Sequence, residues 1–327
     1  MISGEKKMPD WTALKRLLIL LAMIEGLLMS GCMAEEGKSV QVALTDQLNR
    51  RILVVAVSRE AEMPEILYSW TPTQALGFQD VSAYVYPSDV RLRARGTDRT
   101  QVLLTCASGG FCAMAAYPSG ICLWNRALAP EDNPHAIELL PNGCIAVAAS
   151  TGGFIRIYPA DGSDAYAQYP YMDAHGLLWD PGLDVLWAVG KSKLSAFSFT
   201  GTPEAPALTE RRDLRAALPI ANGHDVFPVY GEPDSLWVIA SAPFQYDKVS
   251  RKWIRDYDGA NLLLSQTGTK SCGSADGLTV RTMMDGTWQI WDTATLSVLY
   301  PGADAMTDYV FTDAAIYRAR IWKDAYQ

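Results

Sequence analysis

The stretch that decides the fold is DAHGLLWDPGLDVLWAVG, residues 173–190. It places a histidine before a short apolar run, a turn rich in Asp, Pro and Gly, and a second apolar run. Two other segments have the same order: NPHAIELLPNGCIAVAAS from Asn133 and NGHDVFPVYGEPDSLWVIAS from Asn222. The chain has only three histidines, and each stands at the start of one of these segments. Such self-similarity indicates one structural unit copied along the chain.

A fourth segment, ADGLTVRTMMDGTWQIWD from Ala275, continues the series with an aspartate in the place of the histidine. The four starts are His135, His175, His224 and Asp276, at intervals of 40, 49 and 52 residues. Short strands bounded by turn residues at this period are typical of β-propeller blades. The runs FIRIYP, LSAFSFT and NLLLSQT are the expected outer strands.

The strand pattern continues upstream in QVLLTCASGGFCAMAAYPSGICLWN, RILVVAVS and EILYSW. The first unit lacks an inner strand, which YVFTD and AIYRARIW at the C-terminus could supply, closing the ring and removing exposed sheet edges. The sequence therefore predicts an all-β propeller over residues 46–327. Six blades of about 47 residues fit best, and seven shorter blades would also fit.

The N-terminus has the features of an export signal. Four basic residues precede LLILLAMIEGLLMSGC, an apolar run too short for a membrane-spanning helix. LMSGC resembles a bacterial lipobox, with Cys32 as the lipidated residue, although Met29 and Glu25 depart from that pattern. We expect a signal peptide at 1–31, a tether at 32–45 and a lipid-anchored, extracytoplasmic bacterial protein; plain secretion and a retained anchor are the alternatives.

Together, the lipobox, the three histidine segments and the terminal AIYRARIW resemble a family of uncharacterised secreted bacterial propellers, a domain-of-unknown-function family. The resemblance covers most of the chain after the signal and implies fold and location only. IWDTATLSVLY and the Gly223-His224 pair are also similar to WD repeats, but their spacing does not fit that family.

The net charge of −8 argues against nucleic acid as a partner, because such binding relies on Lys and Arg neutralising phosphates. Sequence motifs of serine hydrolases, nucleotide-binding loops and zinc proteases are absent. We expect a monomer whose partners are the membrane, through the anchor, and a small molecule or glycan.

The repeat predicts where a functional site would lie. The first strand of each blade lines the central channel, so His135, His175, His224 and Asp276 should be neighbours at one channel mouth. Three imidazoles and a carboxylate suit a ligand site and could hold a divalent metal such as zinc or calcium. Peptidylglycine amidating lyases hold a metal on three histidines at a propeller channel, a likeness of arrangement only. The alternative is a structural histidine copied by duplication.

Three functional classes remain open at this point. The first is an anchored propeller that binds a small ligand or glycan at the channel mouth. The second is a metal-dependent lyase or hydrolase that uses the three histidines. The third is a protein-interaction scaffold, since fold alone does not specify function.

Five cysteines remain after Cys32, with no CxxC pair. CASGGFC could place Cys106 opposite Cys112 across a hairpin at a distance that a disulfide accepts. Buried, unpaired thiols are the default expectation.

Overall fold

Residues 39–327 are the part of the chain that the structure, a computed structural model, describes. The expected signal peptide and Cys32 lie outside this range. The folded unit begins at Ser39, earlier than the predicted boundary at 46, because Val40–Asp46 forms strand β1 instead of a tether. Within the described range, none of the helices has the length and apolar character that a bilayer span requires.

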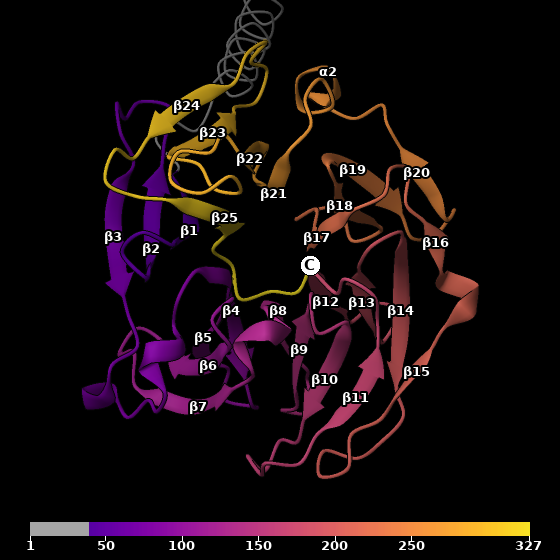
Figure 1. The fold of residues 1–327 in the computed structure, drawn as a ribbon. Coiled ribbons are helices and arrows are strands. Elements are labelled where there is room, and N and C mark those ends of the chain that lie inside the picture. The colour runs from indigo at the N-terminus through magenta and orange to yellow at the C-terminus, as the bar shows by residue number, and fades with distance from the viewer. Residues whose placement is uncertain (1–38) are drawn as a thin grey trace, which may run out of the picture. The chain divides into compact units, whose positions relative to one another are not determined.

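The described residues form six small antiparallel sheets arranged around a centre, as in a six-bladed β-propeller (Figure 1). The inner strands, in order round the ring, are β25, β4, β8, β12, β17 and β21, and each contacts the next. The predictions of an all-β propeller and of six blades are confirmed.

Each blade is listed from its inner strand outward. Blade 1 contains β25 (Ile316–Ile321), β1 (Val40–Asp46), β2 (Arg51–Val57) and β3 (Glu65–Trp70); blade 2 contains β4 (Pro87–Arg95), β5 (Thr100–Ala107), β6 (Phe111–Ala116) and β7 (Cys122–Ala127); blade 3 contains β8 (Pro134–Leu139), β9 (Ile145–Ala149), β10 (Phe154–Tyr158) and β11 (Ala167–Pro170). Blade 4 contains β12 (Gly176–Asp180), β13 (Val185–Val189), β14 (Lys193–Phe199), β15 (Leu208–Glu210) and β16 (Ala216–Ala217); blade 5 contains β17 (Gly223–Pro228), β18 (Ser235–Ala240), β19 (Ala242–Asp247) and β20 (Lys252–Ile254); blade 6 contains β21 (Thr269–Ala275), β22 (Leu278–Met283), β23 (Thr295–Leu299) and β24 (Thr307–Val310).

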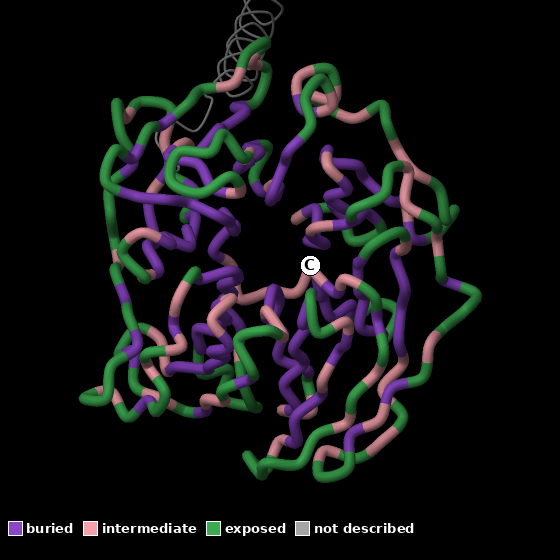
Figure 2. Tube along the Cα trace, viewed as in Figure 1, coloured by how far each residue is buried: buried purple, intermediate pink, exposed green. Residues whose placement is uncertain are grey.

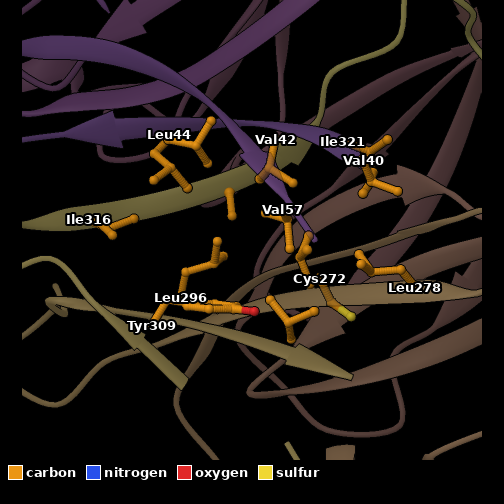
Figure 3. Packing of buried hydrophobic residues seen from close by; sticks show 14 of the residues in the cluster. Val40, Val42, Leu44, Val57, Cys272, Leu278, Leu296, Tyr309, Ile316 and Ile321 are labelled. Carbon is orange, nitrogen blue, oxygen red and sulfur yellow. The ribbon is translucent and has the colours of Figure 1, made fainter. Parts of the chain in front are cut away.

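The C-terminal strand closes the ring, as predicted. Strand β25 pairs with β1 at the other end of the described chain, with Val42 opposite Ile321. Apolar side chains from blades 1 and 6 pack across this seam, among them Leu44, Ile316 and Leu296 (Figure 3). Buried residues are concentrated along the strands, and exposed ones in the outer loops (Figure 2).

Two strand predictions are wrong. YVFTD does not join blade 1, because Tyr309 and Val310 belong to β24 at the outer edge of blade 6. NLLLSQT is not an outer strand, because it overlaps the one-turn helix α2 (Ala260–Leu263).

Cys106 and Cys112 are direct partners on neighbouring strands, but both thiols are free and buried. Burial raises the pKa of Cys106 to about 12 and that of Cys112 well above its usual value, so both remain neutral thiols. The disulfide considered from the sequence is absent.

Candidate ligand site at the channel mouth

A repeated β-bulge sets the geometry of one channel mouth. In blades 2, 3, 5 and 6 the pairing of the inner strand skips one residue near its start: Ser88, His135, His224 and Lys270. A similar shift occurs in blade 1, where Tyr317 and Arg318 lie opposite the single residue Thr45. Bulges redirect side chains at the rims of sheets, and here they do so at equivalent points round the ring.

The residue two positions before these sites shares an unusual backbone conformation. Tyr86, Asn133, Asp173, Asn222 and Gly268 all have positive φ, the left-handed region that Gly, Asn and Asp adopt most easily. This explains the sequences NPH, DAH, NGH and GTK at the entrance to four inner strands.

The three histidines meet at this mouth. The ring centroids of His135 and His175 are 4.5 Å apart, as are those of His175 and His224. All three line a cavity of about 560 Å³, a volume typical of small-molecule sites.

Asp276 does not join them, so the register predicted for the fourth repeat is wrong. Asp276 follows the last residue of β21, at the opposite end of that strand, where its carboxylate lies 3.1 Å from Nζ of Lys323. The position equivalent to the histidines is occupied by Lys270, and blade 1 contributes Tyr317. Sequence reasoning missed both residues. The signal that could have found Lys270 was Gly268, two residues before it.

The histidine rings are held through Nδ1. His135 Nδ1 lies 3.0 Å from the Asn133 carbonyl, and His175 Nδ1 lies 3.0 Å from the Asp173 carbonyl and 3.1 Å from the Asp173 carboxylate. These oxygens only accept hydrogen bonds, so Nδ1 must carry the proton in both rings. In the neutral tautomer, Nε2 is then an acceptor.

Lys270, from blade 6, is the neighbour of His224 in blade 5. Its Nζ lies 2.9 Å from His224 Nε2 and 5.6 Å from the centre of the Tyr317 ring. Burial and the nearby Arg318 lower the pKa of Lys270 to about 8, so the ammonium remains mainly charged at neutral pH.

Burial also lowers the pKa of His135 and of His224 well below 6.5, and the neighbouring His175 acts in the same direction. These two imidazoles are therefore neutral at pH 7.

Beneath the histidines, Arg318 forms hydrogen bonds to three blades. Its guanidinium donates to the backbone carbonyls of His135, His175 and His224 at 2.6, 2.9 and 2.7 Å. The side chain is fully buried. Because Arg318 holds the backbone of all three histidines, it fixes their positions relative to one another.

Deeper in the channel, four arginines alternate with three carboxylates. Asp89 and Asp225 both bind Arg320, Asp89 also contacts Arg91, and Glu138 binds Arg91 and Arg93. Burial alone would raise the pKa of Asp89, but Arg320, Arg91 and Arg318 hold it well below its usual value. The network fills the channel below the mouth and is called the channel core here.

The C-terminal tail covers the other end of the channel. The Ala325 carbonyl accepts hydrogen bonds from Arg93 and Tyr230, and the hydroxyl of Tyr326 donates to the Leu139 carbonyl. The end of the chain lies at the centre of the ring in Figure 1. The cavity is therefore a cup that is accessible from the histidine side.

A model of a family of unknown function, DUF6528, matches residues 15–320. The chain belongs to this family. The uncharacterised family expected from the sequence is thus confirmed, and its origin in secreted bacterial proteins stays a prediction. No curated protein matches the chain.

Solved structures share the fold at low identity. A protein of unknown function from Bacteroides caccae is 11% identical, with a TM-score of 0.57 over 86% of this chain and 98% of that one. A virginiamycin B lyase from Staphylococcus aureus, solved with quinupristin, is 12% identical, with a TM-score of 0.46 over 85% and 86% of the two chains. The likeness to the Bacteroides caccae protein extends to the propeller fold alone.

Proposed function

We propose that this protein is a binding propeller whose channel mouth holds a small ligand, such as a sugar or a short glycan. The observation that carries the proposal is the cup of about 560 Å³ that is lined by His135, His175, His224, Lys270 and Tyr317. These side chains converge from five blades, above a floor fixed by Arg318. Tyr86 and Trp291 add aromatic surface at the rim.

The alternative is a metal-dependent lyase or hydrolase on the three histidines. Nδ1 hydrogen bonds to carbonyl and carboxylate oxygens favour it, because metal-binding histidines are commonly oriented in this way. Two cationic groups argue against a bound metal ion: the Lys270 ammonium at His224 Nε2 and the Arg318 guanidinium below the histidines. Among residues 39–327, no group of three or more His, Cys, Asp or Glu is arranged to hold an ion.

Thermal melting of wild type and His175→Ala separates these proposals. We expect a sugar or small organic acid from a screening panel to raise the melting temperature of wild type only, by about 5–10 °C at 100 times its dissociation constant. Added zinc or calcium, compared with chelator, should leave both proteins unchanged. The exposed Val249→Ala variant serves as the control for nonspecific effects.

A melting shift with zinc that disappears in His175→Ala would contradict this expectation and favour the metal enzyme. If no compound stabilises wild type more than His175→Ala, the binding function fails and the scaffold becomes the better proposal.

The proposed anchor fits a ligand site that faces away from the membrane. Val40 starts β1 near Ile321, whereas Asp46 at the other end of β1 pairs with Ile316, next to Tyr317 of the mouth. The described chain thus begins at the end of the channel opposite to the cup. The eight residue steps from Cys32 to Val40 cover at most about 28 Å in an extended chain.

The anchor predicts that Cys32→Ser moves the protein from the membrane fraction to a soluble fraction, or leaves the signal uncleaved. Cell fractionation and the mass of the mature N-terminus measure this. An unchanged distribution and an unchanged mass would rule out lipidation at Cys32.

A further inference from the structure

The charge inside the cup has no counterion among the residues that the structure describes. Lys270 is 8% exposed, and among residues 39–327 no carboxylate oxygen lies within 4 Å of its Nζ. Its hydrogen-bond partner in that range is the neutral His224 ring. A buried ammonium without an anionic partner is costly, and a ligand that brings a negative charge would compensate it.

The channel core does not neutralise this charge. Its four guanidiniums, from Arg91, Arg93, Arg318 and Arg320, face three carboxylates, from Asp89, Glu138 and Asp225, all of them buried. Within the same residues, Nε of Arg318 has no hydrogen-bond partner. The floor of the cup is therefore cationic.

Two carboxylates lie near the cup. The Asp173 side chain is 31% exposed and is engaged by His175 Nδ1. The other, Glu131, is an exposed residue of the cavity lining. Both belong to loops that lead into inner strands, whereas Lys270 lies within the bulge of β21. An anionic group would reach Lys270 inside the cup, above the cationic floor, with its uncharged part near the rim.

Two histidines of the cup keep a ring nitrogen available to a ligand. The Nδ1 contacts leave Nε2 of His135 and of His175 without a hydrogen-bond partner among residues 39–327. In the neutral His135 ring this atom is an acceptor. The hydroxyl groups of a sugar ring are suitable donors. A simple carboxylate or phosphate without hydroxyls has nothing to donate to these nitrogens.

The rim supplies an apolar surface. Tyr86 and Trp291 pack edge to face, with ring centroids 6.1 Å apart, and both line the cavity. The Trp291 indole N–H is occupied by Gln47, so its ring offers a face instead of a donor. Aromatic faces of this kind suit the C–H face of a sugar ring.

We propose that the ligand is an acidic sugar, a hexuronate free or at the end of a glycan, with its carboxylate on Lys270 and its hydroxyls on His135 and His175. This inference rests on the proposed function and narrows it to one chemical class. The positive charge of the cup matches the carboxylate of such a molecule, the histidine nitrogens match its hydroxyl groups, and the aromatic rim matches the C–H face of its ring.

The test is calorimetric titration of the soluble domain with matched pairs of sugars: D-glucuronate and D-glucose, D-galacturonate and D-galactose, D-mannuronate and D-mannose. Succinate, which carries carboxylates without hydroxyls, is the third arm. We expect at least one hexuronate to bind at least tenfold more tightly than its neutral partner and than succinate, because a hydrogen bond between charged groups is stronger than one between neutral groups.

Lys270→Met should reduce hexuronate affinity at least tenfold and remove the preference over the neutral sugar. Lys270→Arg, which keeps the charge, should retain part of that preference. Lys323→Met is the matched control at the opposite end of β21 and should bind like wild type.

The outcomes test separately whether the mouth binds a ligand and whether that ligand is an acidic sugar. Equal binding of neutral and acidic sugars, lost in His175→Ala, would overturn the acidic class and leave the binding function intact. Binding of succinate as tight as that of the hexuronates would overturn the role of the hydroxyls. If no sugar or acid binds while another compound of the melting panel does so through His175, the acidic-sugar inference fails and the mouth still binds a ligand.

Discussion

Removing residues 314–327 is expected to leave the chain unable to fold. The deletion takes away β25, whose Ile316 and Ile321 are buried at the seam, each worth up to about 1.5–3 kcal/mol. It also removes Arg318 and Arg320, and unpaired buried carboxylates cost about 3–5 kcal/mol. The sum is comparable to the whole stability of an ordinary domain, about 5–15 kcal/mol.

The measurement is the yield of soluble protein together with circular dichroism and thermal melting. The control removes only residues 323–327, which takes away the tail over the channel and keeps β25. This shorter deletion should melt lower than wild type but still cooperatively. A cooperative transition near the wild-type temperature in the 314–327 deletion would show that the ring does not depend on β25.

Asp89→Ala is expected to give the largest loss of stability among single substitutions in the channel core. Asp89 is fully buried, and its carboxylate contacts Arg91, Arg318 and Arg320 and accepts from the Ile137 N–H. Removing it leaves three cationic side chains with one anion fewer. The expected cost is about 3–5 kcal/mol, which lowers the melting temperature by about 10 °C.

Asp164→Ala provides the comparison, because its ion pair with Arg126 is at the surface and its side chain is 97% exposed. Such pairs contribute at most about 1 kcal/mol. If Asp89→Ala and Asp164→Ala melt within a degree or two of each other, the channel core does not stabilise the propeller as described.

The repeat made much of the architecture predictable. Copies of one unit share a register, so three histidines at equivalent positions are expected to meet at one channel mouth. The first blade lacked an inner strand in the sequence, so another part of the chain was expected to supply it. The same reasoning misplaced Asp276, because apolar runs and turn residues alone allowed a shift along β21. The positive-φ residue two positions before the mouth residue, Gly268 in this blade, was the better marker.

The channel core could not be predicted from the sequence. Arg320 and Asp89 are separated by 231 residues, and nothing in their local context distinguishes them from surface charges. Their pairing depends on which faces of the inner strands point to the axis, a property of the closed ring. For the same reason the cationic floor of the cup, and with it the charge of the proposed ligand, became visible only in the fold.

The histidines of this chain can report directly on the central claim, which is that a ligand binds at the channel mouth. All of its histidines, His135, His175 and His224, line the cup. Protein labelled with ¹⁵N and ¹³C in histidine alone, and purified without a histidine tag, therefore gives ring signals from this site and no other.

The decisive measurement is the nuclear magnetic resonance spectrum of this labelled protein with and without the tightest ligand from the melting panel. We predict that the ring signals of all three histidines shift on saturation, and that Lys270→Met weakens the response while Lys323→Met does not. Histidine signals that stay unchanged while the ligand still stabilises the protein would place binding elsewhere and contradict the account.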